Sequence, residues 1–316
     1  MTKYPFENLV FEGGGVKGIA YGGAISVLEK AEILKQIKKV GGASAGAITA
    51  LLVSLDFNAS EISKILKTCK FGDFADKSYG FLRNGYRLFF KFGIHKGDVV
   101  KNWLIKILIK NKINPDITFI EIRDNPKYKE LHILGTNLSR GLSVIFNADN
   151  TPAMSVIDAV RISMSIPVYF VPIRLGDDYY VDGGILNNYP VKIFDEHLNG
   201  LSYTHKNTGK IFNANTLGLR IESAADMNNM TTFMTDNFIQ FITSVIDLLH
   251  GKLQLSYLIE TDWYRTCRIS SGDINATDFD LSDSKLNFLI RNGITGTVQY
   301  LTWFDKNCFP TPKINS

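Results

Sequence analysis

The stretch GGASAG, residues 41–46, decides the fold because it joins a strand-like run to a helix-like one. KKVGG at 38–42 predicts a strand, and AGAITALLVSL at 45–55 predicts a helix. Ser44 stands in the turn between them, in a Gly-x-Ser-x-Gly pattern. A strand that enters a helix through a sharp turn holds its central side chain in a strained, exposed position, which only small neighbours allow. Those neighbours here are Gly42, Ala43, Ala45 and Gly46.

This pattern favours Ser44 as a nucleophile presented at the start of a helix. The free N–H groups and the positive dipole end of that helix would face charge developing on a bound carbonyl oxygen. The alternative is a serine that caps the helix within a glycine-rich turn. A five-residue motif alone leaves both interpretations open.

Strand-like and helix-like runs alternate along the rest of the chain, which is typical of a parallel sheet covered by helices. The predicted strands are 8–12, 129–138, 142–147, 178–188 and 216–222, and the predicted helices are 19–31, 97–112, 154–166 and 233–259. A polar stretch at 200–215 is predicted to be a long surface loop. We therefore expect an α/β fold, a three-layer sandwich with a mainly parallel central sheet and helices on both faces.

Composition limits the possible functions. The 316 residues are 45% hydrophobic and 21% charged, which is enough to build a large core. A net charge of +4 is too small for a nucleic-acid footprint. Neither a membrane-spanning stretch nor a Sec signal peptide is recognisable, and three cysteines without metal-like spacing favour reduced thiols. We expect a cytoplasmic protein, peripheral at membranes, with export by a non-Sec route left open.

A second glycine cluster, EGGGVKG at 12–18, also follows a predicted strand. Gly13, Gly15 and Gly18 satisfy the dinucleotide fingerprint, but no acidic residue ends the second strand to bind a ribose. A Walker A loop is excluded because Lys17 is followed by glycine. Glycines without side chains also let backbone N–H groups point at a substrate oxygen. With the serine turn one βα unit later, this oxyanion-binding use is the favoured interpretation.

A nucleophilic serine needs a base. In the order serine, acid, histidine, the histidines that could serve are His197, His205 and His250, and none of them lies in a glycine-rich turn after a strand. Asp182 in YYVDGG instead follows a strand-like aromatic run and precedes two glycines. An Asp-Gly hairpin turn is the alternative. Burial would raise the pKa of Asp182 and make it a better base.

Four segments together resemble the patatin-like phospholipase family, in the family's order and within about residues 8–190. They are EGGGVKG (12–18), GGASAG (41–46), AVRISMSIPVYFVP (159–172) and VDGGILNNYP (181–190). The resemblance implies one patatin-like catalytic domain over 1–316, in which 191–316 is a less specific C-terminal part. It also implies hydrolysis of membrane lipids by a Ser–Asp dyad without a catalytic histidine.

Carried over to this sequence, the resemblance implies roles for individual residues. Ser44 would be the nucleophile and Asp182 the base, with Gly42 and Gly46 forming the nucleophile elbow. Lys17 fills a place where the family has Arg or Lys, so it is a candidate head-group contact, with a solvated lysine as the alternative. The implied oxyanion donors are Gly13, Gly14 and Gly15.

The predicted function is therefore a phospholipase A-type acyl hydrolase that forms an acyl-enzyme on Ser44. The predicted mechanism needs no metal and no cofactor, and the sequence specifies no protein activator. One alternative is a catalytically silent or partner-activated lipid-binding protein. The other, a nucleotide-binding oxidoreductase, is disfavoured by the missing ribose-binding acid.

The segment YGFLRNGYRLFFKFGIHKG, 79–97, interleaves six aromatic side chains with cations and carries no acidic residue. Such a composition suits a contact with a membrane interface. The alternative is a segment that packs its aromatic residues into the core and turns its cations to water. Membrane phospholipid is thus the predicted partner, with peripheral contact through 79–97 as one interpretation of this segment.

Overall fold

A computed structural model describes residues 3–69, 91–195, 202–204, 211–223, 258 and 260–307. Its central sheet has the strand order β12-β11-β1-β2-β4-β8-β7, with β5 also paired to β4. The strands of this sheet are β1 (Asn8–Phe11), β2 (Lys39–Gly42), β4 (Glu130–Asn137), β5 (Leu142–Phe146), β7 (Ile173–Leu175), β8 (Asp178–Asp182), β11 (Thr216–Ser223) and β12 (Thr266–Gly272).

The sheet is parallel at its centre and antiparallel at one end. β12, β11, β1, β2 and β4 pair in parallel. β5 and β8 run antiparallel to β4, and β7 runs antiparallel to β8. All four residues of β1, NLVF, are buried, as expected for the middle strand of a sheet covered on both faces.

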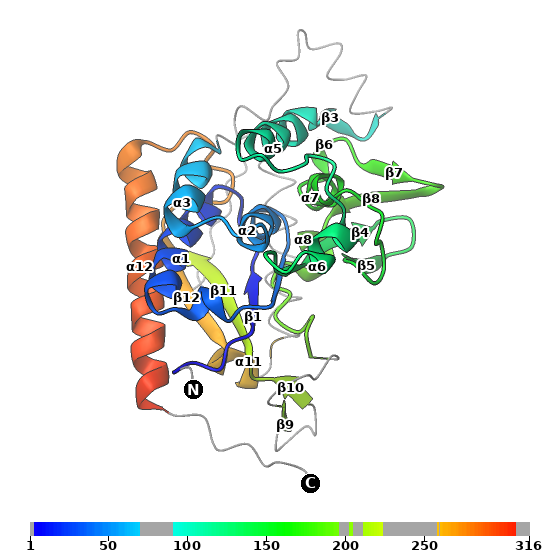
Figure 1. Ribbon diagram of the computed structural model, residues 1–316. Helices are drawn as coiled ribbons and strands as arrows, with labels where there is room; N and C mark the ends of the chain where they lie inside the picture. The colour runs from blue at the N-terminus through cyan, green and yellow to red at the C-terminus, as the bar shows by residue number, and fades with distance from the viewer. Residues whose placement is uncertain are drawn as a thin grey trace.

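Helices flank this sheet, which makes the fold a mixed α/β architecture (Figure 1). α2 packs over β1, β2 and β4, whereas α12 packs along α1 and β12, and α7 packs on β4 and β8. The helices are η1 (Gly15–Ile19), α1 (Ala20–Lys30), η2 (Ile33–Lys35), α2 (Ala45–Ser54), α3 (Ala59–Thr68), α5 (Asp98–Lys110), α6 (Phe119–Asp124), α7 (Val156–Ser163), α8 (Gly184–Asn187), α11 (Glu260–Tyr264) and α12 (Asp283–Lys306).

Two small strand pairs complete the described fold. β3 (Gly93–His95) pairs in parallel with β6 (Val168–Phe170), and β9 (Ser202–Thr204) pairs antiparallel with β10 (Ile211–Asn213). The prediction of a long loop over 200–215 was therefore wrong, because two short strands lie within that stretch. The polar residues that suggested a loop do not prevent local antiparallel pairing.

The predicted fold class and most of the predicted elements are confirmed. The predicted strand at 178–188 is in fact β8 followed by the short helix α8, because Gly183 and Gly184 turn the chain. The helix predicted over 154–166 ends earlier, at Ser163. The predicted helix at 233–259 lies outside the described residues, apart from position 258.

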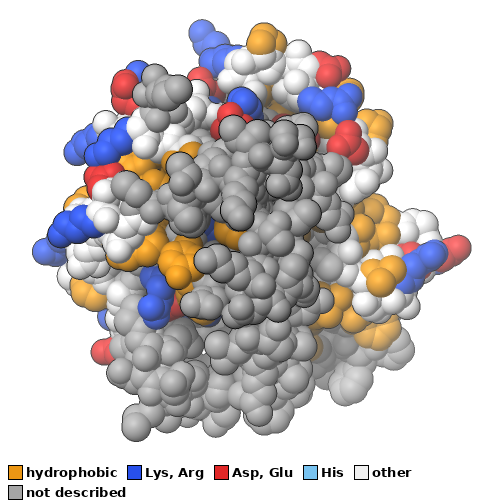
Figure 2. All heavy atoms as spheres, turned by 90° about the horizontal axis from the view of Figure 1, so that it is seen from below, with side chains coloured by type: hydrophobic (Ala, Val, Ile, Leu, Met, Phe, Trp, Pro, Cys, Tyr) orange, Lys and Arg blue, Asp and Glu red, His pale blue; other side chains and the backbone are white. Residues whose placement is uncertain are grey.

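Charges on the described surface are mixed in sign. On the face shown in Figure 2, both Lys or Arg and Asp or Glu side chains are visible among the described residues. Hydrophobic side chains lie exposed between them. Across the ranges that the structure describes, none of the helices has the length and hydropathy required to cross a bilayer.

Candidate active site

Ser44 occupies the turn between β2 and α2, with its backbone at φ +50° and ψ −126°. A non-glycine residue at positive φ is uncommon, and such strain is concentrated at functional sites. A Cβ on Gly42 would collide with the carbonyl oxygen of Gly46, so the turn requires small residues. The Ser44 hydroxyl makes no capping hydrogen bond to α2, which removes the structural basis for the helix-cap interpretation.

β2 and β8 share one edge of β4 and approach each other from opposite directions. Ile133 of β4 pairs with Gly42 of β2 on one edge and with β5 on the other. Gly135 pairs with Asp182 of β8, again on the edge opposite β5. The ends of β2 and β8 are therefore separated by two residues of β4, about 7 Å along the strand. This arrangement brings Ser44, which follows the end of β2, next to Asp182.

Asp182 is a buried carboxyl group whose side chain is 4% exposed. Its Oδ1 accepts a hydrogen bond from the backbone N–H of Gly184 at 2.7 Å. Its Oδ2 makes no hydrogen bond of ordinary geometry with the part of the chain that is described. Burial raises the pKa of Asp182 to about 7, although the nearby Ser44 hydroxyl and the Gly184 N–H lower it in part. The carboxyl group is thus half ionised near neutral pH, beside a serine hydroxyl.

The glycine loop after β1 lies against this pair. A Cβ on Gly13 would collide with Oδ1 of Asn188 and stand 3.1 Å from the Cβ of Ser44, so a side chain here would force the surroundings of Ser44 to shift. Asn188 binds the same glycine twice: its carbonyl oxygen accepts the Gly13 N–H at 2.9 Å, and its side-chain Nδ2 donates to the Gly13 carbonyl at 3.0 Å. The loop is thereby fixed to the segment that follows Asp182.

These contacts correct one of the predicted oxyanion donors. The Gly13 N–H is already donated to Asn188, so in this conformation it is not free for a substrate oxygen. The N–H groups of Gly14 and Gly15 make no hydrogen bond to any described residue. Gly15 also has φ +54°, and a Cβ there would collide with the carbonyl of Ala276. Gly14 and Gly15 therefore retain the donors that the oxyanion hypothesis needs.

Charged residues surround the start of this loop. Glu12 is 4% exposed, and burial raises its pKa to about 7, opposed by the positive charges of Arg220 and Lys17. Glu12 Oε2 accepts the N–H of Ile221 at 2.8 Å, and Oε1 lies 3.6 Å from Nε of Arg220. Lys17 is half-buried near Glu12, so an ion-pair partner in the protein is an alternative to a head-group contact.

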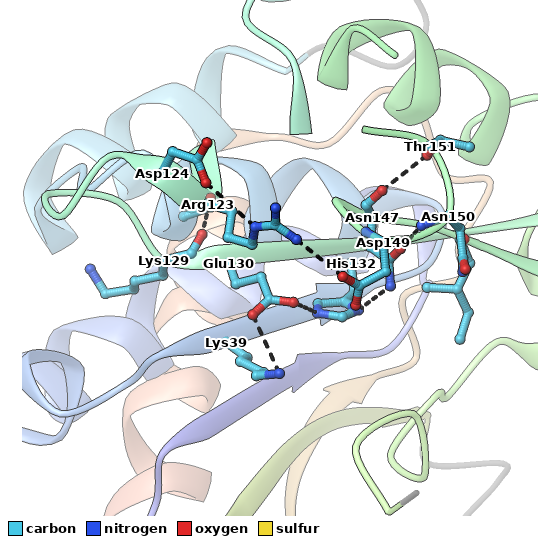
Figure 3. Close-up of polar contacts among 12 residues, drawn as sticks. Lys39, Arg123, Asp124, Lys129, Glu130, His132, Asn147, Asp149, Asn150 and Thr151 are labelled. Atoms are coloured by element: carbon cyan, nitrogen blue, oxygen red, sulfur yellow. Dashed lines mark hydrogen bonds and ion pairs between the residues drawn. The ribbon is translucent and has the colours of Figure 1, made fainter. Parts of the chain in front are cut away.

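The described histidines are engaged elsewhere. Figure 3 shows His132 between Glu130 and Asn147: its Nε2 is 2.9 Å from Glu130 Oε1, and its Nδ1 is 3.2 Å from Asn147 Nδ2. His95 packs against the rings of Tyr169 and Phe170. The candidate bases His197, His205 and His250 lie outside the described residues.

Sequence reasoning did not single out two contacts of this site. The hydroxyl oxygen of Ser163 accepts the backbone N–H of Ser44 at 2.9 Å, and Asn188 holds Gly13 as described above. Both residues lie in the runs at 159–172 and 181–190. No spacing rule connects Ser163 with Ser44, which is 119 positions away. The sequence signal that could have identified Ser163 and Asn188 is their position inside the runs that resemble the family, 159–172 and 181–190.

The assembled groups are a buried serine hydroxyl in a strained turn, a buried carboxyl group with a pKa near neutrality, and, in the adjacent glycine loop, backbone N–H groups that have no hydrogen-bond partner among the described residues. This set can support nucleophilic attack on a carbonyl carbon, with proton transfer to the carboxylate. Within the described ranges, no cluster of three or more His, Cys, Asp or Glu side chains is arranged to hold a metal ion.

The family model for patatin-like phospholipase matches residues 9–195, more than half of the chain. The chain belongs to this family. The match begins in β1 and ends beyond α8, so it includes the glycine loop, the Ser44 turn and Asp182.

Two relatives and one solved structure are similar to this chain. The chain is 32% identical over 201 residues to the uncharacterized protein YqhO of Bacillus subtilis, covering 59% of this chain and 66% of YqhO. It is 30% identical over 193 residues to "Probable lipid hydrolase 463L" of Invertebrate iridescent virus 6, covering 60% of this chain and 63% of that relative. The matches thus span less than two thirds of either relative. The crystal structure of VipD from Legionella pneumophila has the same fold, with a TM-score of 0.61 and 19% identity over 95% of this chain and 67% of VipD.

Proposed function

We propose that this patatin-like protein is a phospholipase A-type lipid acyl hydrolase that uses Ser44 as nucleophile and Asp182 as base. The observation that carries the proposal is a serine in a strained turn, itself only 7% exposed, beside a buried carboxyl group with a pKa of about 7. Family membership supports hydrolysis of lipids as the reaction class. The name of the viral relative 463L points to the same class.

In the proposed first half-reaction, Ser44 Oγ attacks the ester carbonyl carbon while its proton passes to the Asp182 carboxylate. The tetrahedral oxyanion is stabilised by the N–H groups of Gly14 and Gly15, which have no partner among the described residues. The bond to the lipid alcohol then breaks, and Asp182 returns the proton to the leaving oxygen. The products are a free lysolipid and an acyl ester on Ser44.

The second half-reaction uses the same groups with water as the nucleophile. Asp182, ionised again, removes a proton from water as the water attacks the acyl carbon. Collapse of the second oxyanion breaks the bond to Ser44 Oγ, which takes the proton from Asp182, and the fatty acid leaves. Direct proton transfer between the Ser44 hydroxyl and the Asp182 carboxylate would make a histidine relay unnecessary.

The proposed substrate is a membrane phospholipid, reached through peripheral contact by residues 79–97. Residues 79–90 lie outside the described part of the structure. Phe92 is described: its side chain is 55% exposed and packs edge-on against Tyr179 of β8, with ring centroids 5.9 Å apart. This exposed aromatic side chain packs against β8, the strand that ends at Asp182, which supports an interface near the site.

Covalent labelling tests the proposed function. The purified protein should react with a fluorophosphonate probe, and Ser44→Ala should abolish the reaction. Incubation with a mixed phospholipid extract, followed by mass spectrometry, should yield free fatty acid and lysolipid in the wild type alone. A protein that binds phospholipid vesicles but neither labels nor releases fatty acid would be the silent lipid-binding alternative, and the proposal would be wrong.

A further inference from the structure

The turn at the end of α7 contacts the backbone of both proposed catalytic residues. The hydroxyl oxygen of Ser163 accepts the N–H of Ser44 at 2.9 Å. Two residues later, the carbonyl oxygen of Ser165 accepts the N–H of Asp182 at 2.9 Å. Both serines are completely buried, so water does not compete for these hydrogen bonds. One three-residue turn therefore bridges the β2–α2 turn and the end of β8.

This turn is itself firmly held. Arg161, one helical turn before Ser165, is 3% exposed and donates to Ser165 Oγ at 2.5 Å. The same guanidinium group donates to the carbonyl oxygens of Lys96 and Val171. Ser165 Oγ in turn donates to the Arg161 carbonyl at 2.9 Å. Supporting contacts of this kind keep a functional group within the narrow range that catalysis tolerates.

The Ser44 backbone needs such support. A serine at φ +50° retains that conformation only where the surroundings fix it. A hydrogen bond from the Ser44 N–H to α7 fixes the peptide plane before Ser44 and thus the direction of the side chain. It also occupies the Ser44 N–H, so that group is not available to a substrate oxygen.

We propose that Ser163 is a positioning residue, which acts through the Ser44 backbone to direct the Ser44 hydroxyl towards Asp182. Ser163 is not a catalytic residue, because it accepts its hydrogen bond from the Ser44 N–H and not from a reacting atom. The inference rests on the proposed function of Ser44. It assigns a role to Ser163, the first serine of the SMS sequence at 163–165.

The test compares Ser163→Ala with two reference variants on a water-soluble short-chain ester. Ser163→Thr keeps a hydroxyl acceptor at the same Oγ position. Ser54→Ala is the matched control, because Ser54 is also completely buried and donates to the Lys129 carbonyl, at the far end of α2 from Ser44. Rates are divided by the fraction folded, measured by circular dichroism, and each variant is followed from pH 5 to pH 9.

Ser163→Ala should lower kcat about 10²-fold with KM within about twofold, the scale expected when a reacting group shifts by ~1 Å. Its rate should also rise at a higher pH than in the wild type, because the Ser44 hydroxyl lowers the pKa of Asp182 and would contact it less. Ser163→Thr should recover most of the rate. If the added methyl group prevents folding, Ser163→Cys, with a weaker acceptor, should give an intermediate rate. Ser54→Ala should lower the stability of the protein and leave kcat per folded molecule unchanged.

A Ser163→Ala protein with the wild-type kcat and pH profile per folded molecule would overturn the inference. So would equal losses of kcat in Ser163→Ala and Ser54→Ala. Failure of the proposed function looks different: the wild type and Ser54→Ala would then show neither hydrolysis nor fluorophosphonate labelling.

Discussion

Asp182→Asn should stabilise the folded protein at alkaline pH while it removes activity. In the folded state the Asp182 carboxyl group has a pKa of about 7, compared with an ordinary value of 3.8. The folded protein therefore keeps a proton that the unfolded chain releases between these two pH values. Stability contributed by this group is complete below pH 3.8 and is lost as the pH rises through about 7.

The difference between 3.8 and about 7 corresponds to roughly 4 kcal/mol, since each pKa unit equals about 1.4 kcal/mol. This value is an upper bound, because local rearrangement or water entry relieves part of the cost of burying the charge. The amide of asparagine has the same shape and never ionises, so the variant avoids the free-energy cost of ionising a buried carboxyl group. We expect Asp182→Asn to be more stable than wild type at pH 8.5, by up to ~4 kcal/mol or roughly 6 °C in Tm for a chain of this size.

Urea and thermal unfolding at pH 5 and pH 8.5 measure this effect, which should be about 2.5 times larger at pH 8.5, since the cost spans about 1.2 pKa units at pH 5 and about 3.2 units at pH 8.5. Asp178→Asn is the control on the same strand, because Asn137 and Arg140 lower the pKa of Asp178. Its substitution should destabilise the protein by a similar amount at pH 5 and at pH 8.5, because the stabilising contribution of Asp178 is lost only as the pH falls below 3.8, through its lowered pKa. An Asp182→Asn protein with the same stability difference from wild type at both pH values would refute the raised pKa and with it this account of the base.

Three further predictions concern the reaction itself. Ser44→Ala should abolish ester hydrolysis. The double variant with Asp182→Asn should lose little more activity than Ser44→Ala, since the effects of residues that act as one unit are not additive. Additive losses of kcat/KM, measured by steady-state kinetics, would show that Ser44 and Asp182 do not act as a pair. Gly14→Ala should lower kcat on the order of 10²-fold by disturbing an oxyanion donor. The fold should survive this change because φ at Gly14 is −167°, outside the left-handed region, and a Cβ there meets nothing closer than 3.7 Å. Gly15→Ala should instead lower Tm, and an active, folded Gly14→Ala protein would exclude this loop from the mechanism. The wild-type kcat/KM for a soluble ester should rise about tenfold per pH unit up to a pH near 7 and then level off, because the base must be ionised; a flat profile from pH 5 to 8 would contradict Asp182 as the base.

Local sequence was sufficient for features that depend on neighbouring residues. The turn at Ser44 followed from glycines that only a sharp strand-to-helix connection requires, and the structure has that turn. The position of Asp182 at a strand end followed from the aromatic run before it and the two glycines after it. In these cases, the physical cause and the pattern lie within about ten residues of each other.

Features that depend on the assembled fold could not be predicted in this way. Gly13, Gly14 and Gly15 look equivalent in the sequence, yet Gly13 alone gives its N–H to Asn188, 175 positions away. The two short strands within 200–215 arise from pairing that no period-2 hydrophobic pattern announces. Hydrogen bonds between distant segments appear only when the sheet has brought them together.

β2 and β8 pair with the same edge of β4, so β4 sets the distance between the ends of these two strands. Because side chains alternate between faces, a slip of β8 by one residue against β4 would turn the Asp182 side chain to the opposite face of the sheet. A slip of two residues would restore the face but displace the carboxyl group by about 7 Å, beyond hydrogen-bonding reach of Ser44. The register of β2 and β8 on β4 thus sets the distance between Ser44 and Asp182 in whole residues. Any change of register would separate the two side chains and abolish the proposed reaction.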